Sequence, residues 1–279
     1  MDGKKLLIPA GVLSAAYLFA IKPNRKREMK DFDGVLYAHR GYHDNRSEAP
    51  ENSMAAFRKA VERGYGIELD VQLSKDEVPV VIHDFTMHRV MRDAEDRPVS
   101  GKVEDYTFEE LQQFHILRSE EKIPKFEDVL KLVDGKVPLI VELKIERAEW
   151  NPRVCILADE LLKNYTGLYC IESFNPMGVN WYRKNRPDVI RGQLSDRFLF
   201  RSAGNPVVLA FCQSLLFNGV TKPDFVAYNV NYPNAVSRKL CHGLYKNTAV
   251  AWTVKSREQL EKAKKHFDLY IFDSFDPEA

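Results

Sequence analysis

Short apolar runs followed by amphipathic helical stretches recur along most of this chain. Each run has the length of a buried β-strand, and each following stretch carries apolar residues at helical spacing. Eight β/α units in about 250 residues predict an α/β fold of the (β/α)8 TIM barrel type. The apolar runs lie near Val35, Ile67, Leu139, Leu168, Val189, Phe225, Ala249 and Leu269.

A doubly wound open sheet is the alternative fold for such a rhythm. That fold usually carries a glycine-rich phosphate loop after its first strand, whereas the first apolar run here ends in His39-Arg40-Gly41. The barrel is therefore the favoured prediction.

The second apolar run alternates with acidic residues. Glu68 and Asp70 are separated by apolar positions, so a strand places both carboxylates on one side. The chain turns near Lys75-Asp76, and another apolar run then leads to His83. A parallel partner would need a far longer connection, so we expect a small hairpin insertion after strand 2, with His83 returning roughly opposite Glu68. A surface hairpin with solvated charges is the alternative.

The first residues have a different pattern. Residues 6–21 carry no charge and are mostly apolar, with Lys4 and Lys5 before them and further basic residues from Lys22 onward, including Arg25, Lys26 and Arg27. As a helix this segment is about 24 Å long, which is short of the ~30 Å bilayer core but workable if the lysines at both ends snorkel to the membrane interfaces. We expect residues 1–33 to form a single-pass membrane anchor and basic linker, with the domain at 34–279 in the cytoplasm. A cleaved signal peptide and a soluble helix are the alternatives.

Composition narrows the classes of function. The 279 residues are 44% hydrophobic and 29% charged, which is typical of a globular domain with a full core. The formal net charge of +1 argues against a nucleic-acid-binding surface. The four cysteines have neither disulfide-framework nor zinc-site spacing. Nothing in the composition indicates an oligomeric state.

Chemically active residues gather where the first three barrel strands and the hairpin end. In a (β/α)8 barrel these ends meet at one face, so we expect the side chains to lie together. They are His39, Arg40, Glu68, Asp70, His83, Glu142 and Lys144.

Each of these residue types suits a step in cleaving a phosphate ester. Three carboxylates form an oxygen-rich ligand set for Mg²⁺ or Ca²⁺ rather than zinc. Two histidines can act as an acid–base pair. Arginine and lysine offer positive charge to an anionic substrate. The predicted cofactor is therefore a divalent metal ion.

The series of motifs resembles that of the glycerophosphodiester phosphodiesterase family, in order from about residue 35 to 277. The resemblance rests on His39-Arg40-Gly41, Pro50-Glu51-Asn52-Ser53, Glu68-Leu69-Asp70-Val71, His83-Asp84, Glu142-Leu143-Lys144, Ser173-Phe174, Trp252-Thr253-Val254 and Ile271-Phe272-Asp273. Any one of these motifs alone is weak, and the ordered series is specific.

The resemblance implies hydrolysis of a glycerophosphodiester substrate to sn-glycerol 3-phosphate and an alcohol. It implies a metal on Glu68, Asp70 and Glu142, and acid–base roles for the catalytic residues His39 and His83. Arg40 and Lys144 would bind the substrate phosphate.

Two departures from the family pattern concern the hairpin and the loop after it. The hairpin turn has Asp76-Glu77 where the family usually has Asp-Gly, and the loop after His83-Asp84 lacks the usual Arg-Thr-Thr-x-Gly. Preference for a leaving group therefore does not carry over. A membrane-associated phospholipase on the same barrel is the second enzyme hypothesis, and a non-catalytic barrel scaffold is the third. His43 and His88 are expected to be loop residues without a catalytic role.

Overall fold

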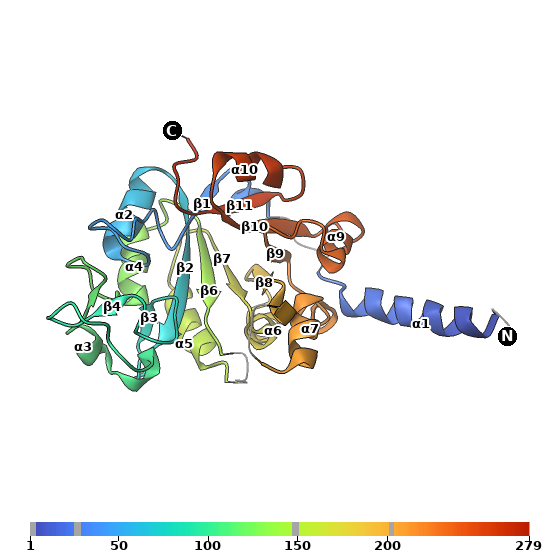
Figure 1. Cartoon of the computed structure of the whole chain (residues 1–279), viewed down its shortest axis with the longest axis horizontal. Coiled ribbons are helices and arrows are strands. Elements are labelled where there is room, and N and C mark those ends of the chain that lie inside the picture. Colours follow the sequence, from blue (N-terminus) through green and yellow to red (C-terminus); the bar gives the residue numbers. More distant parts are fainter. Residues whose placement is uncertain (1–3, 25–28, 147–150, 201–203, 279) are drawn as a thin grey trace.

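Eight parallel strands close into a barrel in the computed structural model of this chain (Figure 1). The structure describes residues 4–24, 29–146, 151–200 and 204–278. Each barrel strand pairs with its neighbours, and β1 pairs with both β11 and β2, which closes the sheet. The predicted (β/α)8 barrel is confirmed. Its strands are β1 (Leu36–His39), β2 (Gly66–Leu73), β6 (Leu139–Leu143), β7 (Tyr169–Ser173), β8 (Arg191–Ser195), β9 (Phe225–Asn229), β10 (Thr248–Val254) and β11 (Leu269–Phe272).

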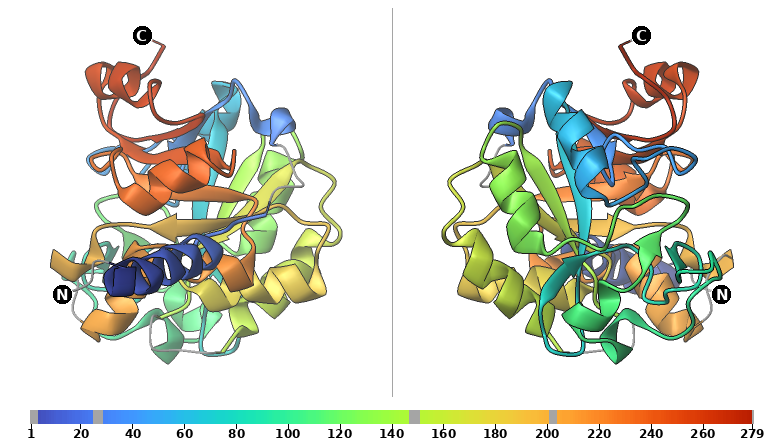
Figure 2. Two further views of the ribbon diagram at one scale, coloured as in Figure 1. Left: turned by 90° about the vertical axis from the view of Figure 1, so that its right-hand side faces the viewer. Right: turned by 90° about the vertical axis from the view of Figure 1, so that its left-hand side faces the viewer.

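Helices lie outside the sheet, on the connections between strands (Figure 2). Polar side chains start several of them: Ser53 accepts a hydrogen bond from the Ala56 N–H, and Asn175 accepts one from the Met177 N–H. The helices are α2 (Met54–Glu62), α4 (Phe126–Val133), α5 (Arg153–Leu162), α6 (Pro176–Asn185), α7 (Pro206–Gln213), α8 (Asn218–Thr221), α9 (Val236–Gly243) and α10 (Arg257–Ala263).

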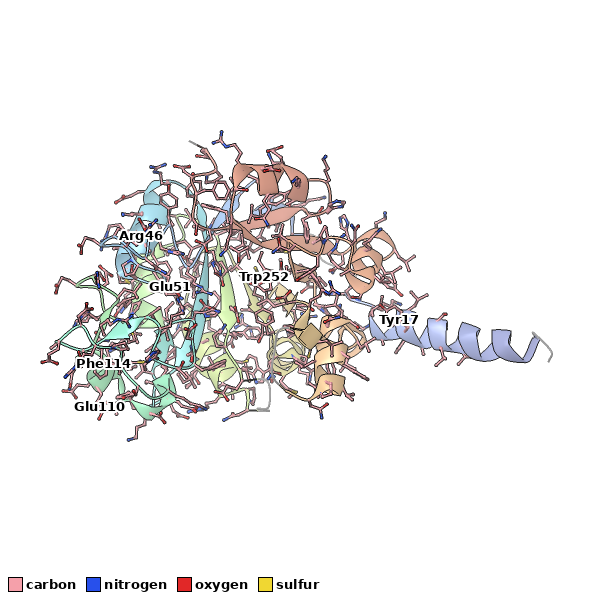
Figure 3. The ribbon with its side chains drawn as sticks, viewed as in Figure 1. Tyr17, Arg46, Glu51, Glu110, Phe114 and Trp252 are labelled. Carbon is pink, nitrogen blue, oxygen red and sulfur yellow. The ribbon has the colours of Figure 1, made fainter. Side chains whose placement is uncertain are left out.

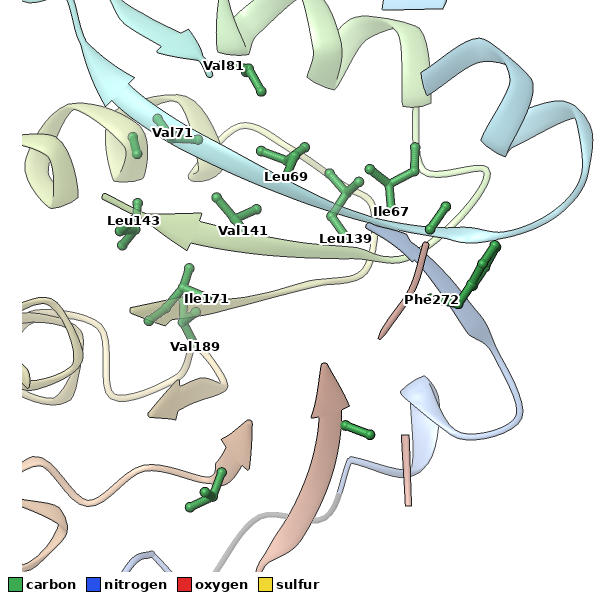
Figure 4. Packing of buried hydrophobic residues seen from close by; sticks show 14 of the residues in the cluster. Ile67, Leu69, Val71, Val81, Leu139, Val141, Leu143, Ile171, Val189 and Phe272 are labelled. Carbon is green, nitrogen blue, oxygen red and sulfur yellow. The ribbon is translucent and has the colours of Figure 1, made fainter. Parts of the chain in front are cut away.

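The main hydrophobic core lies between the sheet and these helices. Ile67, Leu69 and Val71 follow one another along β2, beside the corresponding residues of β6 (Figure 4). Phe57 of α2 and Phe126 of α4 are fully buried in the same cluster. Burying such a side chain contributes about 1.5–3 kcal/mol, so this layer supplies much of the stability of the fold.

A second cluster fills the inside of the barrel. Tyr37, Ile140 and Cys170 are fully buried within it. Side chains alternate across a strand, so His39 and Glu142, two positions further on, lie on the same inner face at the C-terminal strand ends. The packed interior of the barrel thus lies directly beneath the functional side chains at the C-terminal strand ends and limits their movement.

A short strand, β3 (Pro79–Val81), pairs antiparallel with β2 in the register Val71↔Val81. The turn between them has Glu77 in the left-handed region, with φ of 60°. Its carboxylate receives two hydrogen bonds, at 2.8 and 2.7 Å, from the Arg153 guanidinium of α5. Glu77, which departs from the family pattern, therefore links the hairpin tip to helix α5 on the outside of the barrel.

The chain after β3 forms a small lobe with its own apolar core, whose buried members include Met87, Met91 and Leu111. In it, β4 (Met91–Arg92) pairs antiparallel with β5 (His115–Ile116), and α3 (Phe108–Leu111) begins at a Thr107 cap. This lobe lies beside β3 (Figure 1), and its Lys102 lines a cavity that also reaches Lys144 at the end of β6.

The predicted membrane anchor is wrong. Helix α1 (Lys4–Ala20) has 17 residues and, at about 1.5 Å per residue, is too short for a bilayer core of about 30 Å. Among the described residues, no helix is long and apolar enough to cross a membrane. The predicted localisation, a membrane-anchored protein with its catalytic domain in the cytoplasm, depended on that anchor and is therefore also wrong. Arg25, Lys26 and Arg27 of the predicted basic linker lie outside the described residues.

Helix α1 extends away from the barrel and joins it at the C-terminal end of the helix (Figure 1). Tyr17 marks this junction (Figure 3). The Leu18 carbonyl accepts a hydrogen bond of 2.8 Å from the Tyr245 hydroxyl, and Ile21 is fully buried. The segment is thus anchored to the protein at its C-terminal end.

Candidate active site

Three carboxylates meet on the inner face of neighbouring strands. Asp70 of β2 lies in register with Glu142 of β6, and Glu68 precedes Asp70 by two positions on the same face. One oxygen from each lies within 4.8 Å of the others. All three side chains are buried. This is the acidic group expected from the sequence.

Two cations lie against these acids. Lys144 Nζ is 2.9 Å from Glu142 Oε1 and 3.4 Å from Asp70 Oδ1. Arg40 Nε is 3.5 Å from Asp70 Oδ2, and the Arg40 backbone N–H donates to Glu68 Oε2 at 3.1 Å. Arg40 itself has φ of 56°, a strained conformation for this residue type that turns the chain sharply after β1.

The three acids respond differently to this environment. Burial, and then the charges of Asp70 and Glu142, raise the pKa of Glu68 well above its usual range. Burial also raises the pKa of Glu142, with Lys144 opposing it. For Asp70, burial by itself raises the pKa, but the neighbouring His83, Lys144 and Arg40 side chains together hold it far below its usual range. At Glu68, the nearby cations therefore do not offset the effect of burial and of the two neighbouring carboxylates.

His39 stands at the end of β1. Its Nε2 atom is 3.9 Å from Glu68 Oε2, and its Nδ1 atom faces Asp273, which follows β11. Burial, reinforced by the nearby Arg40 charge, lowers the pKa of His39 to about 4. The imidazole is therefore neutral at pH 7.

His83 reaches the site from the hairpin. The Ile82 N–H donates to the Asp70 carbonyl, so His83 returns beside Asp70, slightly off the expected position opposite Glu68. Its Nδ1 atom is 2.6 Å from Asp84 Oδ1. Gln72 Nε2 donates to the carbonyls of His83 and Asp84, which fixes this loop.

The structure thus brings together all seven residues expected from the sequence, and it adds a supporting ion-pair network. Glu51 Oε1 is 2.6 Å from nitrogens of both Arg40 and Arg89, and Arg89 also contacts Asp84. Burial raises the pKa of Glu51, but Arg89 and Arg40 together lower it to about 2. Figure 3 marks Glu51 beside the strands of the site.

Asn52 and Glu172 complete the inner layer. Asn52 Nδ2 donates to Asp70 Oδ2 at 2.9 Å, a contact that orients this carboxylate. Glu172 of β7 lies in register with Glu142, and its Oε2 atom is buried without a hydrogen-bond partner among the described residues. The sequence could have indicated Glu172 as a site residue, because it ends the apolar run that begins near Leu168 and so lies at a strand end.

Aromatic side chains lie beside this charged group. Phe174 makes edge-to-face contacts with Trp252 (centroids 5.4 Å apart) and with Phe198 (5.8 Å). Lys144 Nζ is 6.0 Å from the Phe174 ring centre. A separate cavity of about 420 Å³ reaches Lys144 and is lined by Gln72, Lys102, Glu146 and Arg153 among others. The site therefore combines a charged half with an aromatic half that can pack against apolar parts of a substrate.

Comparison with known proteins identifies this combination. A model of the "Glycerophosphoryl diester phosphodiesterase family" matches residues 39–276. A "Glycerophosphodiester phosphodiesterase" of Caldanaerobacter subterraneus is 40% identical over 173 residues, which are 57% of this chain and 66% of that protein. One of Bacillus altitudinis is 37% identical over 120 residues, which are 40% of this chain and 45% of that protein. The matched segments span about half to two thirds of these relatives.

Solved structures share the fold. A phosphodiesterase of Oleispira antarctica, in complex with the product sn-glycerol-3-phosphate, has a TM-score of 0.67 at 20% identity and covers 87% of this chain and 94% of its own. A putative glycerophosphoryl diester phosphodiesterase from Silicibacter pomeroyi has a TM-score of 0.69 at 18% identity, with coverage of 92% and 93%. At these identities the likeness carries the fold alone.

Proposed function

Because the chain belongs to the glycerophosphoryl diester phosphodiesterase family, we propose that it hydrolyses glycerophosphodiesters to sn-glycerol 3-phosphate and an alcohol. The observation that carries the proposal is the meeting of a three-carboxylate group with two histidines and two cations at one barrel mouth. Each of these groups can contribute to phosphate ester cleavage, as metal ligand, acid or base, or positive charge beside the phosphate.

The donor set fits a divalent cation. Glu68, Asp70 and Glu142 offer hard oxygen ligands at mutual distances that one ion can span. Asp70 Oδ1 is buried and accepts no hydrogen bond from the described residues. When bound, the ion would supply positive charge to the phosphate oxygens and to the acids that now repel one another. Mg²⁺ and Ca²⁺ both suit this ligand set.

The two histidines would divide the proton transfers. One removes a proton from the nucleophile, which is water or the neighbouring glycerol hydroxyl, and the other protonates the departing alkoxide. Each ring has a carboxylate facing Nδ1: Asp273 for His39 and Asp84 for His83. Each therefore presents Nε2 to the substrate.

Arg40 and Lys144 would bind the phosphate of the substrate. Both are held near the carboxylates by ion pairs, which keeps their side chains in place before substrate arrives. A guanidinium can bind two phosphate oxygens at once, and an ammonium adds a point charge. Both would offset the negative charge that builds on the phosphate oxygens during cleavage.

A second candidate substrate class is a lysophospholipid. The aromatic contacts of Phe174, Phe198 and Trp252 favour it, since an apolar alcohol moiety would pack against these rings. Deacylated glycerophosphodiesters remain the first candidate because the charged half of the mouth contributes most of the functional groups.

A coupled assay for glycerol 3-phosphate tests the proposal. Purified protein is offered glycerophosphodiesters and, in parallel, micellar lysophosphatidylcholine, whose cleavage to lysophosphatidic acid is followed by the release of choline. Both substrates are tested with Mg²⁺, Ca²⁺ or Mn²⁺, and with chelator. We expect turnover of the deacylated substrates that chelator abolishes and metal restores. Turnover on micellar lipid alone would favour the second class, and no turnover of any phosphodiester would refute an enzymatic function.

A further inference from the structure

Asp273 lies next to a proposed catalytic histidine. Strands β1 and β11 pair in parallel with Ala38 opposite Phe272, so the residues that follow, His39 and Asp273, emerge side by side. Asp273 Oδ2 is 3.5 Å from His39 Nδ1. The His39 Nδ1 atom is buried and has no hydrogen bond of standard geometry within the described residues, so this carboxylate is placed to be its acceptor.

The second oxygen of Asp273 is also engaged. Asp273 Oδ1 is 3.2 Å from His43 Nε2 and accepts a hydrogen bond of 2.7 Å from the Ser274 hydroxyl. Lys255 Nζ lies 3.9 Å from Oδ2. Burial by itself raises the pKa of Asp273, but its contacts with His39 and His43 hold that pKa well below its usual range. The carboxylate is therefore charged at any pH at which the enzyme would work.

We propose that Asp273 is a positioning residue that keeps the proton of His39 on Nδ1, so that Nε2 is the atom facing the reaction. A carboxylate only accepts hydrogen bonds, so the facing ring nitrogen must carry the proton. The Nε2 lone pair then lies on the side of Glu68, 3.9 Å away. This inference rests on the proposed function, since it assigns a purpose to His39 in proton transfer.

The second histidine has the same arrangement from a different part of the fold. Asp84 Oδ1 is 2.6 Å from His83 Nδ1, and Arg89 holds Asp84 in turn. Both histidines thus have a carboxylate on Nδ1 and leave Nε2 for the site. The His39–Asp273 pair, at 3.5 Å, is longer than the His83–Asp84 pair, at 2.6 Å.

His39, His43 and Asp273 also have the spacing of metal ligands, because one atom from each lies within 4.8 Å of the others. The contacts of Asp273 favour the hydrogen-bonding role. Its two oxygens face different histidines, and they already meet the Ser274 hydroxyl and the Lys255 ammonium. A metal would have to displace these partners.

The decisive variant is Asp273→Asn, because an amide can donate to Nδ1 and favour the wrong tautomer. We expect kcat to fall by about 100-fold or more with little change in KM. Asp273→Glu should restore part of the loss. Asp276→Asn is the matched control: Asp276 is three residues further on, and it bonds Tyr65 and Arg63 instead of a histidine. It should lower the melting temperature and keep kcat.

Three measurements decide between the outcomes: the activity assay, NMR and a metal titration. If the wild type cleaves no glycerophosphodiester, the proposed function fails; if it does and Asp273→Asn keeps wild-type kcat, this inference alone is overturned. Nitrogen-15 NMR of the wild type should find His39 as the Nδ1–H tautomer, and an Nε2–H tautomer would refute the inference even if the variant does not fold. Zn²⁺ titration in the presence of Mg²⁺ should not distinguish wild type from His43→Ala. A zinc site lost in both His43→Ala and Asp273→Asn would overturn the hydrogen-bonding role.

Discussion

The two faces of β2 differ in what they do for the protein. On the outer face, Ile67, Leu69 and Val71 are fully buried against helices and stabilise the fold. On the inner face, Glu68 and Asp70 are buried beside Glu142 and repel one another until cations offset them. The alternation along one strand therefore places the stabilising apolar residues on one face and the functional carboxylates on the other. The free energy gained by apolar burial on the outer face must exceed the free energy lost to carboxylate repulsion on the inner face.

The largest expected effect comes from the histidines that face this inner surface. His39→Ala and His83→Ala should each reduce kcat by about 100- to 10,000-fold, because each removes a proton-transfer group. Circular dichroism and the melting temperature should stay close to those of the wild type. The coupled glycerol 3-phosphate assay measures the loss.

The exposed loop residue His88 provides the matched control. His88→Ala should retain wild-type kcat. Substantial activity in either His39→Ala or His83→Ala would remove that histidine from the mechanism.

On the outer face, Leu69→Ala should show the opposite pattern. It leaves a cavity in the fully buried layer and should cost about 2–5 kcal/mol of unfolding free energy. The kcat of the remaining folded enzyme should change little. Urea unfolding measures the first quantity and the coupled assay the second, and a large loss of kcat in fully folded protein would show that the two faces are not independent.

The inner face should contain a residue whose neutralisation stabilises the metal-free protein. Burial, and then the charges of Glu142 and Asp70, raise the pKa of Glu172 well above its usual range. A raised carboxyl pKa means that the folded state keeps its proton longer than the unfolded state, so stability falls as pH rises above the unfolded value of 4.5. Glu172→Gln removes this penalty and should stabilise the protein by about 1 kcal/mol or more at pH 7.

Thermal melts across pH measure this effect. The gain in Glu172→Gln should be absent below pH 4 and should grow above it. A variant that melts below the wild type at pH 7 would mean that Glu172 is compensated by a partner.

The smallest effect is expected at the hairpin tip, beyond both faces. Glu77→Gly relieves a left-handed backbone conformation but removes the exposed ion pair with Arg153. These effects oppose each other, so the melting temperature should change by less than about 2 °C. Glu77→Ala loses the ion pair and keeps the strain, so it should melt lower than Glu77→Gly. The reverse order would contradict this account of the turn.

Much of the fold and site followed from local pattern. Short apolar runs between helical stretches identified the strands, and the parallel barrel places strand ends together, so residues as distant as His39 and Glu142 could be expected to meet. The contact of His39 with Asp273 spans 234 residues and depends on the barrel closing in one register. Such closure leaves no local signal, because the motif Ile271-Phe272-Asp273 does not say what it faces.

Other features could not be predicted for different reasons. Which cation pairs with which acid depends on side-chain geometry, as for Glu51 between Arg40 and Arg89. The membrane anchor was predicted from an apolar stretch with basic residues on both sides, on the assumption that a bilayer tolerates its short length. Length decided against it, since α1 (Lys4–Ala20) has 17 residues. Composition indicates what surface a helix prefers, and only length says whether it can span a bilayer.

Binding of a divalent cation tests the central claim about the inner face most directly. Mg²⁺ and Ca²⁺ are titrated calorimetrically into chelator-treated wild type, Asp70→Asn and the control Asp276→Asn. We predict one binding site in the wild type and in Asp276→Asn, and affinity at least about 10-fold weaker in Asp70→Asn. A wild type that binds neither cation, or an Asp70→Asn variant that binds as tightly as the wild type, would contradict the account.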